Sequence, residues 1–178
     1  MILIERARAM HAAGFETMSR WLGGDVLPLL ARLALAGVFW RSLLTKVSTV
    51  NLLTYTEFIN DFPVERARLR LPDLPLELRS ATLHQFRGDF ALPLLPAELV
   101  AWMATLAEFV LPILLVIGLM TRLSALALIV MTLVIQVFIY PDAWWSTHAL
   151  WVVIAGYVVV QGPGRASADH VAGGFFAR

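Results

Sequence analysis

The chain has 178 residues, of which 59% are hydrophobic and only 15% are charged, and its mean hydropathy is +0.74. Soluble domains contain about half apolar and a quarter charged residues, so this composition is typical of a membrane protein. The net charge of +1 gives no field that would favour a nucleic acid as partner. The chain has no cysteine, which excludes disulfides, thiolate metal sites and a dithiol redox centre formed by its own residues.

Residues 1–24 predict an amphipathic interfacial helix at the membrane surface. Apolar residues recur there at helical spacing, but Glu5, Arg6 and Arg20 make the segment too charged to cross a bilayer. No apolar core precedes a small-residue cleavage site, so we do not expect a cleavable signal.

Four later blocks are apolar and long enough to cross a bilayer, which takes about 20 residues each. They cover residues 26–47, 98–117, 121–140 and 143–161, and only a few residues join the last three. Pro141 ends the third block, and a Gly-Pro-Gly run at 162–164 ends the fourth. The sequence therefore predicts an all-α membrane protein, with a four-transmembrane-helix bundle over residues 25–170 and a tail at 171–178.

Residues 48–97 form an extramembrane loop between the first and second spans. Residues 51–61 are expected to extend the first helix or to lie at the membrane interface. Residues 66–71 and 76–79 alternate apolar and charged side chains on either side of the sequence PDLP at 72–75. Alternation with a period of two, interrupted by a turn, predicts a β-hairpin with one apolar face.

Arginines near the span ends indicate the orientation. The side that holds the N-terminal segment, the turn between the second and third spans, and the C-terminal tail carries most of them: Arg6, Arg8, Arg20, Arg122, Arg165 and Arg178. Cytoplasmic segments are enriched in Lys and Arg, so both termini are expected in the cytoplasm and the hairpin loop outside.

Polar residues inside the spans are the candidate functional residues, because burying an ionisable group in a bilayer is costly without a partner or a water-lined cavity. With a rise of about 1.5 Å per residue, Glu108 falls near the middle of its span. Four side chains are expected to converge in one pocket open to the outside, as a ligand pocket or proton relay: Arg41, Glu108, Gln136 and His148.

Structural roles are weighed against this hypothesis. Arg32 and Glu108 are expected to form an intramembrane pair that only stabilises the bundle. Lys46 and Arg122, at span ends, are expected to extend to the headgroups. Gln136 can serve as a hydrogen bond between helices, and His148 can lie at the interface beside the aromatic residues of the third turn.

Cofactor motifs are absent from the sequence. The four histidines do not have the spacing of metal ligands, and no heme, flavin or phosphate-binding motif is present. We therefore expect no metal site.

Several segments resemble the DoxX family. They are FWRSLLTK at 39–46, FRGDFALPLLP at 86–96, Glu108 followed by PILLVIGLMTR at 112–122, Tyr140-Pro141 with Trp144 and His148, and GPGRASAD at 162–169. The resemblance covers residues 26–170 and implies a four-helix membrane bundle. It also implies a bacterial inner-membrane protein, with relatives linked to quinol oxidase, to thiosulfate–quinone electron transfer, or to complexes that manage oxidative stress. It transfers no catalytic residues.

Three functions remain open, and the sequence does not decide whether the protein is an enzyme. The first is an accessory component of a membrane redox system that binds a quinone, with Trp40 and Phe109 as walls of the slot. The second is a non-enzymatic scaffold that recruits a partner protein through the 48–97 loop. The third is a small transporter that functions as a homo-oligomer, although no span is interrupted at mid-depth.

Overall fold

The computed structural model describes residues 16, 18–19, 21–60, 62–93 and 95–176. Within them, four helical stretches are long and apolar enough to cross a bilayer, namely Leu22–Lys46, Ala97–Ile117, Thr121–Phe138 and Pro141–Gln161. All four overlap the predicted spans closely, which confirms the four-helix membrane fold. The interfacial helix expected at 1–24 falls almost wholly outside the described residues.

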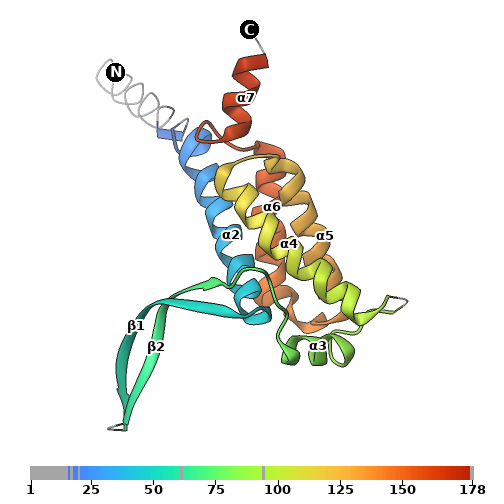
Figure 1. Cartoon of the computed structure of the whole chain (residues 1–178). Coiled ribbons are helices and arrows are strands. Elements are labelled where there is room, and N and C mark those ends of the chain that lie inside the picture. Colours follow the sequence, from blue (N-terminus) through green and yellow to red (C-terminus); the bar gives the residue numbers. More distant parts are fainter. Residues whose placement is uncertain (1–15, 17, 20, 61, 94, 177–178) are drawn as a thin grey trace, which may run out of the picture.

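Two strands and several short helices accompany the spans (Figure 1). The elements in chain order are η1 (Leu22–Val26), α2 (Leu27–Lys46), β1 (Thr49–Ile59), β2 (Phe62–Pro72), α3 (Ser80–Arg87), α4 (Ala97–Ile117), α5 (Thr121–Phe138), η2 (Pro141–Ala143), η3 (Trp144–His148), α6 (Ala149–Gln161) and α7 (Ala168–Phe176).

The core lies between the four spans. Helix α2 packs against α4 and α6, and α5 packs against the same two helices, so the spans form a closed bundle. Leu35 and Phe39 of α2 are buried against Leu115 of α4, Leu128 of α5 and Val158 of α6. Large apolar side chains on the outer faces are exposed, as expected where a span contacts lipid rather than water.

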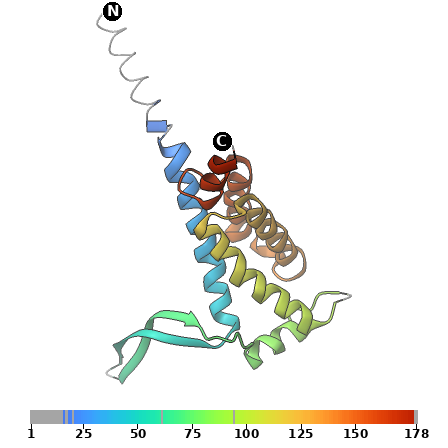
Figure 2. The same cartoon turned by 45° about the horizontal axis from the view of Figure 1, so that its top comes forward.

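The two ends of the bundle differ. Helices η1 and α7 lie at one end, with the turn between α4 and α5, whereas the hairpin and α3 lie at the other (Figures 1 and 2). Trp145 and Tyr140, at the hairpin end, are 89% and 50% exposed, which is typical of an aromatic belt at a membrane interface.

Arg32 ties together the end away from the hairpin. Its guanidinium is buried and donates to the carbonyls of Leu115 and Val116, at 2.8 and 3.0 Å, in the last turn of α4. It also donates to the carbonyls of Pro163 and Ala166, at 2.5 and 2.9 Å. Carbonyls at a helix C-terminus lack helical partners and carry partial negative charge, so a cation stabilises them. The expected pair of Arg32 with Glu108 is therefore wrong.

Asp169 completes this end of the bundle. Its carboxylate accepts hydrogen bonds from the backbone N–H groups of Met120 and Thr121, at 2.8 and 2.9 Å, and so caps the N-terminus of α5. Burial alone would raise the pKa of Asp169, but the bonds from Thr121 and Met120 and the nearby charge of Arg32 together lower that pKa below its ordinary value.

The β-hairpin expected between the first and second spans is confirmed, but the predicted turn is wrong. Strands β1 and β2 pair antiparallel from Thr49↔Pro72 to Ile59↔Phe62, so the chain reverses next to Asn60 and not at 72–75. Residues 49–59 are rich in Thr, Val, Tyr and Phe, which favour strands over a helical extension. The hairpin projects sideways from the bundle, and its apolar residues are largely exposed (Figures 1 and 2).

We expect Gly118→Ala to destabilise the bundle. Gly118 has φ +74°, and an added Cβ would lie 2.5 Å from the Cβ of Ser167. The left-handed conformation alone costs about 1–2 kcal/mol for a residue with a side chain, and the clash adds to it. Thermal unfolding in detergent measures the loss.

The matched control is Gly156→Ala, since a Cβ at Gly156 meets nothing within 4 Å. We expect this variant to unfold at or slightly above the wild-type temperature, because Ala favours a helix interior over Gly. Equal behaviour of the two variants would contradict the proposed packing at Gly118.

Candidate functional site

A cavity of about 1010 Å³ lies at the hairpin end of the bundle. Its walls come from the C-terminal turns of α2, the first half of α4, the second half of α5 and the start of the fourth span. Helix α3 and the segment that follows it contribute the remaining wall. A cavity of this size exceeds what side-chain packing normally leaves in a core, and it is large enough for a drug-sized ligand.

The wall formed by α3 is held in place at two points. Thr82 donates a hydrogen bond of 2.8 Å from its hydroxyl to the carbonyl of Lys46, at the end of α2. Phe86 is buried against Val100 and Ala101 of α4. The ring of Phe90 then meets Phe86 edge-on at 5.5 Å and Tyr140 at 5.7 Å. These contacts fix α3 and the segment after it as one wall of the cavity.

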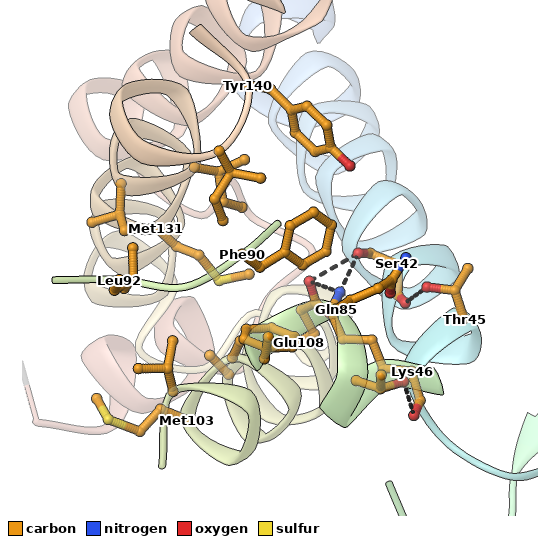
Figure 3. A pocket seen from close by; sticks show the side chains of 18 of the residues that line it. Ser42, Thr45, Lys46, Gln85, Phe90, Leu92, Met103, Glu108, Met131 and Tyr140 are labelled. Atoms are coloured by element: carbon orange, nitrogen blue, oxygen red, sulfur yellow. Dashed lines mark hydrogen bonds and ion pairs between the residues drawn. The ribbon is translucent and has the colours of Figure 1, made fainter. Parts of the chain in front are cut away.

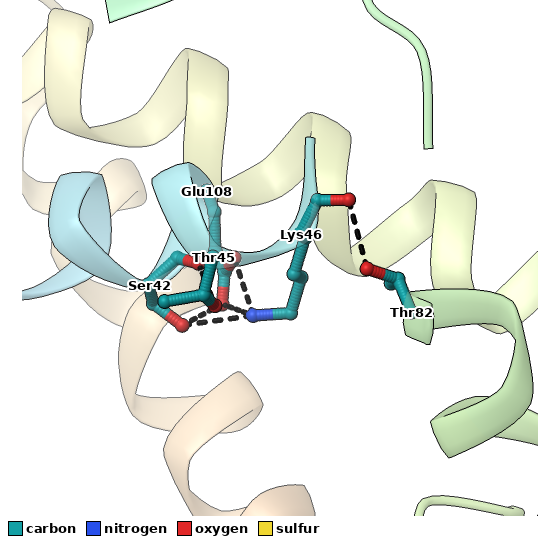
Figure 4. Close-up of polar contacts among 5 residues, drawn as sticks. All are labelled: Ser42, Thr45, Lys46, Thr82 and Glu108. Atoms are coloured by element: carbon teal, nitrogen blue, oxygen red, sulfur yellow. Dashed lines mark hydrogen bonds and ion pairs between the residues drawn. The ribbon is translucent and has the colours of Figure 1, made fainter. Parts of the chain in front are cut away.

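A buried ion pair between α2 and α4 forms the polar part of the cavity wall (Figures 3 and 4). Lys46 Nζ lies 2.8 and 2.7 Å from Oε1 and Oε2 of Glu108, and 2.8 Å from Oγ of Ser42. Ser42 in turn donates to Glu108 Oε1 at 2.9 Å. The Lys46 and Glu108 side chains are only 13% and 2% exposed. Lys46 therefore points inwards, and the expectation that it extends to the headgroups is wrong.

Helix geometry explains this arrangement. Ser42 and Lys46 are four residues apart, so they lie one above the other on the face of α2 that packs against α4. Lys46 lies in the last turn of α2, where a cation is also favoured by the helix dipole. An ammonium beside a carboxylate in the bilayer satisfies the requirement that each buried charge has a partner.

His148 supplies a second polar group. Its Nδ1 lies 2.6 Å from Oε1 of Gln136, and the Gln136 amide donates to the carbonyl of Pro141 at 2.5 Å. Because the amide oxygen can only accept, Nδ1 of His148 must carry a proton, which leaves Nε2 as the ring nitrogen for a ligand. His148 is buried and lines the cavity beside Trp151.

The structure brings together two of the four predicted site residues and places a third beside them. Glu108 and His148 both line the cavity. Gln136 does not line it but is hydrogen-bonded to His148. Arg41 is exposed and outside the cavity, because it lies about 100° around α2 from Ser42. Trp40 and Phe109 stack on each other at 6.0 Å and do not line the cavity, so their predicted role as its walls is wrong.

Sequence reasoning missed Ser42 and Lys46 as site residues. The signal was present, because their spacing of four residues within an apolar helix places two polar groups on one face. It also missed the contribution of Thr82, Gln85 and Phe90, for which the sequence offers no periodic signal. Among the described residues, no group of three or more His, Asp or Glu side chains could hold a metal ion.

Comparison with known proteins places the chain in a family. A family model described as DoxX matches residues 27–141. The chain belongs to the DoxX family. The match includes Ser42, Lys46 and Glu108 and stops before His148. No curated protein and no solved structure matches this DoxX protein.

We expect Glu108→Ala to destabilise the protein strongly, because it leaves the Lys46 ammonium buried without its partner. Removing one member of a buried pair costs about 3–5 kcal/mol, whereas replacing both by apolar side chains costs far less. The double variant Lys46→Met/Glu108→Met is therefore expected to be more stable than Glu108→Ala in thermal unfolding. Glu98→Ala, at an exposed position in the first turn of α4, is the control and should change stability by less than about 1 kcal/mol. A double variant less stable than Glu108→Ala would contradict the pairing.

Proposed function

We propose that this DoxX protein binds a quinone in the cavity at the hairpin end and acts as an accessory component of a membrane redox system. The observation that carries the proposal is a cavity of about 1010 Å³ with a mostly apolar lining and two separate polar groups. A quinone has the matching chemistry, which is a flat apolar ring with a carbonyl oxygen on each side.

The polar groups suit the two carbonyl oxygens. Lys46 and Ser42 donate hydrogen bonds from one wall, and a ligand carbonyl would replace one of the acceptors that Lys46 Nζ now has. Nε2 of His148 accepts a hydrogen bond from a quinol hydroxyl when neutral and donates to a quinone carbonyl when protonated. The rings of Phe90, Tyr140 and Trp151 line the cavity and offer flat surfaces for stacking.

Reduction of a quinone to a quinol takes two electrons and two protons. In this proposal Glu108 and His148, which line the cavity, pass the protons. Because the chain has no cysteine, the proposal assigns electron transfer to a partner protein of the same membrane. In this account the DoxX protein holds the quinone, and the partner reduces or oxidises it.

We further propose a location in the bacterial inner membrane with both termini in the cytoplasm. Helices η1 and α7 lie at the end of the bundle that carries Arg122 and Arg165, and cytoplasmic ends are enriched in such cations. The cavity would then open in the outer half of the bilayer.

Quinone binding is testable on protein purified in mild detergent. We expect decylubiquinone to quench tryptophan fluorescence and to raise the unfolding temperature of the wild type. Lys46→Met combined with Glu108→Met, and separately His148→Ala, should each weaken binding about tenfold or more, because a hydrogen bond to a charged or polar donor is lost. Arg41→Gln, outside the cavity, is the control and should bind as the wild type does. No quinone in lipid extracts, together with unchanged stability on adding one, would contradict the proposal.

A scaffold function is favoured by one separate observation. The hairpin projects from the bundle and exposes large apolar side chains, including Phe58 and Phe62, which are 72% and 73% exposed. Exposed apolar surface of this kind marks sites of interaction.

Shortening the hairpin separates the two functions. Deleting residues 54–68 and joining Leu53 to Leu69, which are paired in the register, through an Asn-Gly turn keeps the base of the hairpin. If quinone binding is the function, the shortened variant should complement a strain that lacks the protein. The double variant Lys46→Met/Glu108→Met should fail to complement it. The reverse result would support the scaffold.

A further inference from the structure

We infer that the cavity is entered from the lipid, between α4 and α5, and that its ligand is a membrane-soluble amphiphile. The polar head of that ligand lies at Ser42, Lys46 and Glu108, and its apolar chain leaves past Met103 and Val130. This inference deepens the proposed function, because it assigns a route and a ligand class to the same cavity.

The position of the cavity along α4 and α5 supports a lateral opening. The two helices are joined by a short turn at Gly118 at the far end of the bundle. The cavity lining comes instead from the other half of each helix, residues 100–108 of α4 and 127–135 of α5. Space therefore opens between them at the hairpin end, away from their shared turn.

The rim of this opening is exposed within the membrane-spanning region. Met103 of α4 and Val130 of α5 line the cavity, yet they are 59% and 56% exposed. Both lie inside spans, so the medium that they contact is lipid. Small side chains just inside the rim, at Ala104, Ala107 and Ala127, leave room for a chain to pass.

The polarity of the lining changes across the cavity. Figure 3 shows Met103, Met131 and Leu92 on one side and Ser42, Lys46 and Thr45 on the opposite side. The lipid-facing wall thus offers only apolar contacts, whereas the far wall offers charged and hydroxyl groups. An amphiphile that enters between the helices meets the polar wall head first, with its chain still in the lipid.

Contacts of α3 cover part of the aqueous side of the cavity. Helix α3 is fixed to the end of α2 by the bond from Thr82 to Lys46, and Phe86 is only 3% exposed. The edge-on contact between Phe90 and Tyr140 joins the segment after α3 to the end of the third span. These contacts narrow the aqueous side, where the lining residues Thr45 and Gln85 are exposed.

The absence of native cysteine allows a direct test of the route. A single cysteine is placed inside the cavity by Ala107→Cys in the full chain, reconstituted in lipid vesicles. Two maleimides are compared, a pyrene maleimide that dissolves in the bilayer and a sulfonated maleimide that does not. We expect the pyrene reagent to label the cysteine and the sulfonated reagent to react at least about tenfold more slowly.

A larger side chain at the rim should then slow labelling by the pyrene reagent, which enters from the lipid. Adding Val130→Trp, or separately Met103→Trp, to Ala107→Cys is expected to slow pyrene labelling about tenfold. Leu123→Trp, at a 57% exposed position of α5 outside the cavity, is the matched control and should leave the rate unchanged. Thermal unfolding shows whether either rim variant fails to fold. In that case the labelling rate of the other rim variant tests the route.

Two outcomes would overturn the inference: equal labelling by the two reagents, or equal rates in the rim variants and the Leu123→Trp control. The assay uses no quinone, so it is independent of the proposed function. If the labelling results are as expected but the protein binds no decylubiquinone, the lipid route is supported and the quinone proposal is contradicted. If the protein binds decylubiquinone but the rim variants label at the same rate as the control, the proposed function stands and the lipid route is refuted.

Discussion

The ion pair between Lys46 and Glu108 is the interaction on which the site depends. A lone ammonium or carboxylate inside a bilayer is strongly unfavourable, so each of these residues requires the other. Their bond fixes the end of α2 against the middle of α4, with Ser42 as a shared neighbour. It also places the polar wall of the cavity, since the remaining lining is largely apolar. The same two charges thus join two helices and form the polar wall of the cavity.

The opposite end of the bundle is held together by hydrogen bonds to the backbone. Arg32 binds four carbonyls there, and Asp169 caps α5, so the segment after the fourth span locks α4 and α5 together at their turn. The protein can then keep a large cavity at the hairpin end. The hydrogen bonds of Arg32 and Asp169 and the large cavity thus lie at opposite ends of the bundle.

Sequence predicted the parts of this structure that have a periodic or compositional signal. The four spans, the existence of a hairpin, and the location of Glu108 and His148 in the same half of the bundle follow from hydropathy and helix geometry. The hairpin's turn was misplaced because residues 49–59 are apolar enough to read as helix or strand, and only their pairing with 62–72 decides.

The charge pairing could not be predicted in the same way. Arg32 and Lys46 are both cations of α2, and the sequence does not indicate which of them faces Glu108. Arg32 finds its partners in carbonyls of the last turn of α4 and of the segment 163–166, and the sequence has no signal for these contacts. Lys46 turns inwards because Ser42 and Glu108 together offer three acceptors, a property of tertiary packing rather than of its position at the end of a span.

We propose that this DoxX protein holds an amphiphilic quinone with its head at the Lys46–Glu108 pair. The most direct measurement is a cryo-electron microscopy map of the protein in lipid nanodiscs that contain decylubiquinone. We expect ring-shaped density between Ser42–Lys46–Glu108 and His148, with a tail that leaves between α4 and α5. A cavity that is collapsed or filled only by lipid chains, at a resolution that shows the surrounding side chains, would contradict it.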